Sequence, residues 1–219
     1  MYEVNVEIAQ KVIDAVKPGL VKGLGEQIPG QMCVEAAVCF AYGLPHSDEP
    51  PCVGFHVRSL KIRLNDSNWE SNQSRAKGML RLSVAQLGSD QIDQIEFRKI
   101  VQKMTIQKFL PLILRKAGMN EAADRCEAEG TVTSAKAAHV VAYNAAYYAS
   151  SAAYYAADAA AKYASSAADA ADAAYYAADA VRYIASVLGE QIFHNFAEEV
   201  VQILIQMKSP GCEYLYLTE

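Results

Sequence analysis

Apolar residues recur every three or four positions along most of the chain, a spacing that predicts helices. Val4, Ile8, Val12 and Val16 form the first such stripe, and Pro18-Gly19 ends it. Four further stripes predict helices at residues 53–64, 76–87, 91–117 and 192–207. Pro111 must break or kink the third of these, because proline cannot donate to the preceding turn.

Residues 30–43 differ from these amphipathic stripes because they are apolar nearly all round, which predicts a central, buried helix. The glycine- and proline-rich stretches on either side, 18–30 and 43–52, read as loops. After Pro210-Gly211 the tail alternates weakly between polar and apolar residues, so we expect a short strand or an ordered tail there.

The segment 131–188 is built almost wholly of Ala, Tyr, Ser and Asp and contains neither Gly nor Pro, which favours helix. Polar residues recur in it at seven-residue steps, at Asn144, Ser151, Asp158, Ser165, Asp172, Asp179 and Ser186. Tyrosines flank this polar stripe, and the opposite face is alanine. A seven-residue period implies a left-handed supercoil. The segment therefore forms either a helical hairpin or one long helix paired with a second chain, with low-complexity disorder as the alternative.

These elements predict an all-α fold with a compact helical body and a long Ala/Tyr-rich helix or helical hairpin. The body spans residues 1–130 and contains a motif segment at 30–89. The Ala/Tyr-rich element spans 131–188, and a C-terminal helix and tail occupy 189–219. We expect a homo-oligomer, because the alanine face needs a partner.

Composition narrows the function classes. With 20 Lys and Arg against 25 Asp and Glu the chain is mildly acidic, which argues against nucleic-acid binding. No apolar run of about 18 residues predicts a membrane span, and the N-terminus lacks the pattern of a signal peptide. Five irregularly spaced cysteines are then expected to be free thiols in a cytoplasmic protein.

Positive charge concentrates in one short stretch, which favours an anion or nucleotide pocket. The stretch surrounds Trp69, the only tryptophan, and holds Arg58, Lys61, Arg63, Arg75, Lys77 and Arg81. Arginine grips phosphate with two parallel hydrogen bonds, and an aromatic ring can stack on a base. The alternative is a solvated basic face with Trp69 in the core.

Glu35 is a carboxylate among apolar neighbours, and burying it without a partner would be costly. It could work as an acid or base with His46 and Asp48. The alternative is a structural bond to Arg58, Arg63 or a backbone amide.

Cysteine chemistry near Glu35 could take two forms. Cys33, Cys39, His46 and Cys52 carry atoms that zinc accepts, but their spacings fit no zinc finger or ribbon. Cys39 could act as a nucleophile with His46 as its base, although a thiol deep in an apolar helix is inert. We therefore predict no metal and no cofactor.

Residues 30–89 resemble a group of uncharacterised proteins found in phage and bacterial genomes. The resemblance rests on Cys33-Val34-Glu35-Ala36-Ala37-Val38-Cys39, Gly43-Leu44-Pro45-His46-Ser47-Asp48, Pro51-Cys52-Val53, Lys61-Ile62-Arg63-Leu64-Asn65-Asp66, Trp69, Arg75-Ala76-Lys77-Gly78-Met79 and Ala85-Gln86-Leu87-Gly88-Ser89. The Ala/Tyr-rich segment is similar to that group more loosely. Glu70 departs from it, because a serine is expected after Trp69. The resemblance implies a phage or mobile-element setting, with the host cytoplasm as the compartment, and carries no mechanism.

The leading functional prediction is a non-catalytic protein that binds a small phosphorylated, nucleotide-like ligand. By analogy it could sequester a signal used in host defence. The predicted ligand-binding residues are Glu35, His46, Asp48, Arg58, Arg63, Asn65, Asp66, Trp69, Arg75 and Arg81. Two alternatives remain: a hydrolase using Glu35, His46 and Asp48, and a structural or protein-interaction role of the Ala/Tyr helix.

Overall fold

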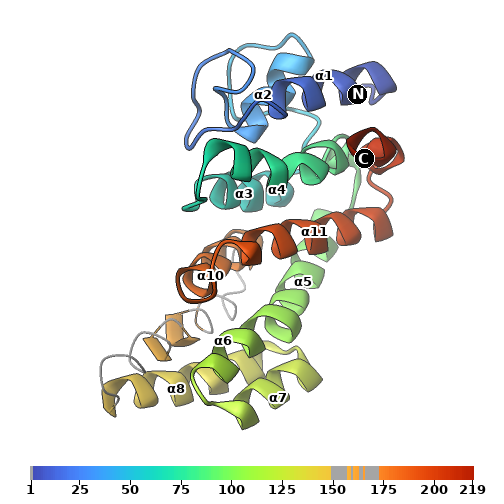
Figure 1. Cartoon of the computed structure of the whole chain (residues 1–219). Helices are drawn as coiled ribbons and strands as arrows, with labels where there is room; N and C mark the ends of the chain where they lie inside the picture. Colours follow the sequence, from blue (N-terminus) through green and yellow to red (C-terminus); the bar gives the residue numbers. More distant parts are fainter. Residues whose placement is uncertain (1, 149–156, 159, 163–164, 166–172) are drawn as a thin grey trace. The chain divides into compact units, whose positions relative to one another are not determined.

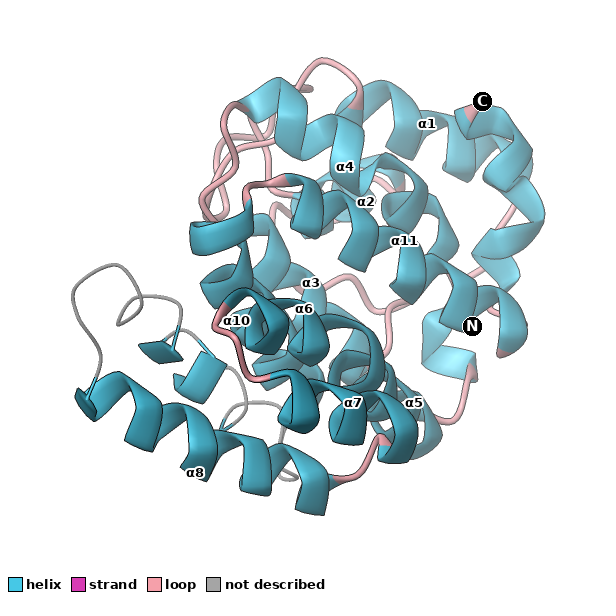
Figure 2. Ribbon diagram, turned by 60° about the horizontal axis from the view of Figure 1, so that its bottom comes forward, coloured by secondary structure: helices cyan, strands magenta, loops and turns pink. Residues whose placement is uncertain are grey.

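A computed structural model describes residues 2–148, 157–158, 160–162, 165 and 173–219 (Figure 1). Among these residues the secondary structure is helical, without a strand, which confirms the all-α prediction (Figure 2). The chain divides into two compact units, residues 1–97 with 193–219, and residues 98–192. The sequence instead suggested divisions near 130 and 188. No helix in the described part of the chain is long and apolar enough to cross a membrane.

The first unit is built from short helices around one central helix. Its elements are α1 (Val6–Val16), α2 (Val34–Ala41), α3 (Phe55–Asn65), α4 (Asn72–Ala85), η1 (Ser89–Gln91) and η3 (Pro210–Thr218). It also contains the start of α5 (Gln94–Met104) and most of α11 (Gln191–Gln206). Seven of the eight residues of α2 are buried, and α2 packs against α1, α3 and α4. The predicted central helix is therefore confirmed, with its first-turn amide at Ala36 capped by the Cys33 thiol.

The C-terminal tail forms a 3₁₀ helix, so of the two predicted alternatives, a short strand or an ordered tail, the second is correct. Pro210 opens η3, and the Gly211 amide donates to the Leu87 carbonyl over 2.7 Å. Leu215 is buried as η3 packs on α4 and α1. Packing against the core therefore decides the structure of the tail, and its weak polar–apolar alternation does not.

The second unit contains the break in the predicted helix 91–117. After α5 comes a π-helical stretch, η2 (Thr105–Phe109), and then α6 (Leu110–Lys116), with Pro111 in its first turn. Proline suits that position because the first amides of a helix have no partner within it. The sequence missed the next helix, α7 (Asn120–Glu129). Only Ala123 and Cys126 of α7 are buried, so it shows no apolar stripe.

The Ala-rich helix α8 (Val132–Tyr148) follows α7 after Gly130, whose φ of 59° lies in the left-handed region. Ala135, Ala138, Ala142 and Ala146 are buried, whereas Tyr143 is 61% exposed. This alanine face packs on α7 and α6, so it has a partner within the same unit. The helix α10 (Ala173–Leu188) packs on α6. Whether 131–188 forms one helix or two depends on residues 149–172, most of which lie outside the described residues.

Candidate functional site

Glu35 on α2 faces Lys61 on α3, with Oε1 and Nζ 3.0 Å apart and neither side chain exposed. The partner of Glu35 is therefore Lys61, where the sequence had suggested Arg58, Arg63 or a backbone amide. Burial raises the pKa of Glu35 and lowers that of Lys61, while their mutual attraction opposes both shifts. The pair joins α2 to α3 at the centre of the first unit.

The Glu35 carboxylate is only partly satisfied by this contact. The distance to Nζ suits a hydrogen bond, but its alignment does not. The second oxygen, Oε2, is buried and has no hydrogen-bond partner among the described residues. A buried acceptor without a donor is costly, so this oxygen is a position where an added donor would bind favourably.

A small cavity of about 30 Å³ lies against this carboxylate. Its walls come from the loop before α2, from α2 itself, from the loop after it and from α3, through Gly23, Leu24, Cys33, Val34, Glu35, Asp48, Ile62, Asn65 and Asp66. About 10–15 Å³ suffices for one water molecule, so the cavity accepts a small polar group. It gathers four predicted site residues, Glu35, Asp48, Asn65 and Asp66.

Asn65 and Asp66 at the end of α3 also hold the loop 18–33 in place over the cavity. The Gly23 amide donates to Asp66 Oδ1 over 2.8 Å, and Asn65 Nδ2 donates to the Val21 carbonyl over 2.9 Å. His46 Nε2 lies 2.9 Å from the Gly25 carbonyl. His46 therefore supports this loop and does not line the cavity, so Glu35, His46 and Asp48 do not meet around one space.

The cavity is acidic. Three carboxylates line it, from Glu35, Asp48 and Asp66, against the one ammonium of Lys61 beneath. Asp48 is half-buried and has no ion-pair partner in the described part of the chain. Arg58 faces Glu35 only at longer range and contacts Glu49 at 3.5 Å. Such a surplus of negative charge favours a cation or a hydrogen-bond donor.

The predicted phosphate-binding residues have intramolecular partners instead of a shared cavity. Arg75 is buried and donates from Nε to the Asn65 carbonyl and from Nη1 to the Leu20 carbonyl, each over 2.8 Å. Arg81 pairs with Glu198 at 3.0 Å. Arg63 lies half-buried on α3.

Trp69 lies in the core, as the alternative to a nucleotide pocket predicted. Its side chain is 7% exposed, and its Nε1 donates to the Leu64 carbonyl over 2.9 Å. Its ring packs 5.0 Å from that of Phe193, centroid to centroid. The ring is therefore not free to stack on a ligand base.

The cysteines beside the cavity are poor nucleophiles. Burial raises the pKa of Cys33 and of Cys39 to about 11, and also raises that of Cys52. Among the residues that the structure describes, no group of three or more His, Cys, Asp or Glu side chains could hold a metal ion.

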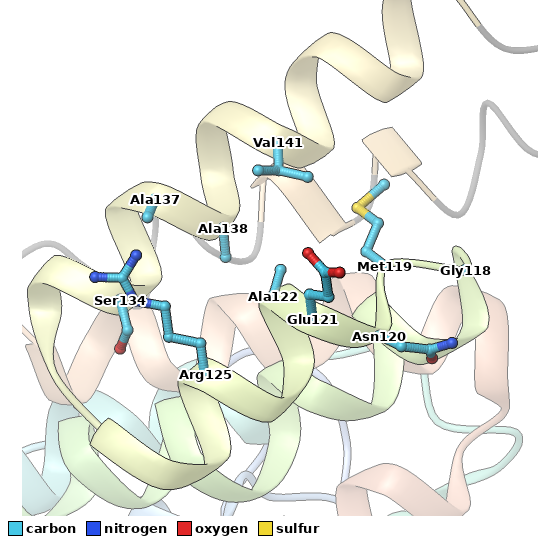
Figure 3. Close-up of a pocket in the computed structure, with 10 residues that line it drawn as sticks. All are labelled: Gly118, Met119, Asn120, Glu121, Ala122, Arg125, Ser134, Ala137, Ala138 and Val141. Atoms are coloured by element: carbon cyan, nitrogen blue, oxygen red, sulfur yellow. The ribbon is translucent and has the colours of Figure 1, made fainter.

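A larger cavity of about 610 Å³ lies in the second unit, between α7 and α8 (Figure 3). This cavity was not predicted, because the apolar pattern did not reveal α7. Its α8 wall is Ser134, Ala137, Ala138 and Val141, which share one helix face. By volume, the cavity in the second unit is the stronger candidate site, whereas by buried charge the Glu35 cavity in the first unit is. We rank the Glu35 cavity first for function, because its polar atoms are fixed and partly unsatisfied.

Comparison with known proteins gives no family for this chain. No family model, no curated protein and no solved structure matches it. The similarity of residues 30–89 to phage and bacterial proteins therefore stays a prediction, and function has to be argued from the residues themselves.

Proposed function

We propose that the chain is a non-catalytic binding protein for a small ligand that presents an ammonium or guanidinium group to the Glu35 cavity. The observation that carries this proposal is Glu35, which lines the cavity and whose Oε2 is buried without a hydrogen-bond donor among the described residues. A charged donor placed there would form a charge-assisted hydrogen bond, which is stronger than a neutral one.

The charge balance supports a cationic ligand group over an anionic one. A phosphate in this cavity would lie against the carboxylates of Glu35, Asp48 and Asp66. The arginines expected to grip it, Arg75 and Arg81, already bind carbonyl groups and Glu198. The phosphorylated ligand predicted from the sequence therefore becomes the competing chemistry in the test.

The positions of His46 and Cys33, the candidate base and nucleophile, favour binding without turnover. His46 bonds to the loop at Gly25, and the nearby Cys33 thiol stays protonated because its pKa is raised to about 11. Neither side chain is then placed as base or nucleophile toward a ligand in the cavity.

The test is an NMR titration of ¹⁵N-labelled protein with methylammonium, guanidinium, inorganic phosphate and adenosine monophosphate. The Gly23 amide and the Asn65 side-chain amide report directly, because both residues line the cavity. We expect both cations to shift these two signals and both phosphates to leave them unchanged. Phosphate-dependent shifts without cation-dependent ones would overturn the proposal.

Asp48→Asn is the variant of choice, because Asp48 lines the cavity and no described hydrogen bond or ion pair of its side chain is lost. We expect it to weaken cation binding about fivefold, the scale of one partly exposed charge pair. Asp14→Asn is the matched control, since Asp14 is an exposed α1 residue outside the cavity. Equal affinities of the two variants would count against the site.

A further inference from the structure

The cavity between α7 and α8 has the size and lining of a small-molecule site. Ligand sites are commonly 300–1,000 Å³, with apolar walls and a few placed polar groups, and this one measures about 610 Å³. Small side chains on α8, Ala137 and Ala138, leave the space between the two helices open. The cavity lies wholly within the second unit, so it is independent of the Glu35 site.

Two opposite charges project into the cavity from α7. Figure 3 shows Glu121 and Arg125 reaching from α7 toward α8. They are four residues apart, so their Cβ atoms lie about 5–6 Å from each other along one helix face. Arg125 pairs with Glu129 at 2.9 Å, whereas Glu121 has no ion-pair partner in the described residues.

The facing wall is apolar. Ala137, Ala138 and Val141 of α8 line it, and Val141 is 47% exposed although it is a large aliphatic residue. Covering this wall with a ligand would remove apolar surface from water, which favours binding. The complementary molecule carries a cation and an anion at one edge and an apolar body at the other.

We propose that this cavity binds an apolar dipeptide as a zwitterion. Its ammonium group would face Glu121, its carboxylate would face Arg125, and its side chains would cover Ala137, Ala138 and Val141. Two residues of extended chain span at most about 7 Å, which is comparable to the spacing of about 5–6 Å between the Cβ atoms of Glu121 and Arg125. A single amino acid carries both charges on one carbon, so it holds them closer together than a dipeptide does.

The experiment is calorimetric titration with leucyl-leucine, its N-acetyl derivative and its C-terminal amide. We expect the native protein to bind the free dipeptide about three- to tenfold more tightly than either blocked form, because each block removes one partly exposed ion pair. Equal binding of all three, or no binding of the free dipeptide, would overturn the proposal.

Variants assign each contact to its end of the ligand. Glu121→Gln should remove the preference for a free amino group while keeping that for a free carboxylate, and Arg125→Gln should do the reverse. Glu129→Gln is the matched control: it frees Arg125 from its ion pair and should tighten carboxylate binding. Weaker binding in Glu129→Gln would contradict the placement of the carboxylate.

The apolar wall is tested separately with Ala137→Leu, which fills the cavity from a half-buried position. Circular dichroism checks that the helices persist. Loss of dipeptide binding with helicity intact supports the site, and unchanged affinity places the dipeptide elsewhere and overturns it.

Discussion

Lys61 places its ammonium 3.0 Å from the Glu35 carboxylate, and neither side chain reaches solvent. Breaking such a buried pair costs about 3–5 kcal/mol, because one uncompensated charge stays behind, whereas apolar replacement of both partners is often neutral. We therefore expect Lys61→Met to destabilise the fold by about that amount. The double variant Glu35→Leu/Lys61→Met should regain most of it in urea denaturation.

The double variant also separates structure from function. If the pair served only to join α2 to α3, the double variant would bind methylammonium as the native protein does. Our proposal requires that it folds and has lost this binding, because Glu35 Oε2 is gone.

The two single variants should depend on pH in opposite directions. In Lys61→Met, burial raises the pKa of Glu35 from its ordinary 4.5, so stability is retained at pH 4.5 and lost as pH rises toward the raised pKa. In Glu35→Gln, burial lowers the pKa of Lys61 from 10.5, so stability is greatest above pH 10.5 and lost as pH falls toward the lowered pKa.

The measurement compares each single variant with the double apolar variant, which lacks both groups. Each slope is limited to about 1.4 kcal/mol per pH unit. Relative to that reference, Lys61→Met should be more stable at pH 5 than at pH 8, and Glu35→Gln more stable at pH 9.5 than at pH 7. Parallel pH profiles would mean that water reaches the pair.

Local patterns in the sequence were enough for much of the fold and for part of the site. The stripe of α1, the apolar α2 and the break at Pro111 follow from periodicity and from proline chemistry. Glu35 was recognised as a carboxylate among apolar residues that needs a partner. Lys61 was not recognised as that partner, because it belongs to a run of basic residues and lies 26 positions further along the chain. The helix α7 carries no stripe, so its cavity was invisible.

Two arginines of α4 should differ sharply in their effect on stability. Arg75 donates to the carbonyls of Leu20 and Asn65 and is buried, so Arg75→Met leaves buried acceptors unpaired and should cost about 3 kcal/mol. Arg81 pairs with Glu198 near the surface, and Arg81→Met should cost about 1 kcal/mol or less. Thermal unfolding measures both. If Arg75→Met destabilised the protein as little as Arg81→Met, Arg75 would be available to bind a ligand.

Gly78 should tolerate no side chain while Trp69 lies against it. A Cβ at this position would come within 2.4 Å of Trp69 Cζ3, and such overpacking costs about 1–3 kcal/mol. We expect Gly78→Ala to destabilise the protein although alanine favours helix. In a Trp69→Phe background the ring atoms that clash are absent, so the same change should be neutral or stabilising. An unchanged penalty there would assign the clash to His194 instead.

The thiols should be slow to react in the folded protein. Burial raises the pKa of Cys33, Cys39, Cys126 and Cys212 to about 11 from an ordinary 9.0. At pH 8 the thiolate fraction of each then falls about a hundredfold, before any loss of access is counted.

Labelling with a disulfide reagent should modify Cys212 first, because the other four side chains are more deeply buried, and all five only after unfolding. Cys212→Ser should remove the first phase. If Cys33 or Cys39 instead reacted in the native state at the unfolded rate, an activated thiolate would lie beside Glu35, and catalysis by a cysteine nucleophile would replace the binding proposal.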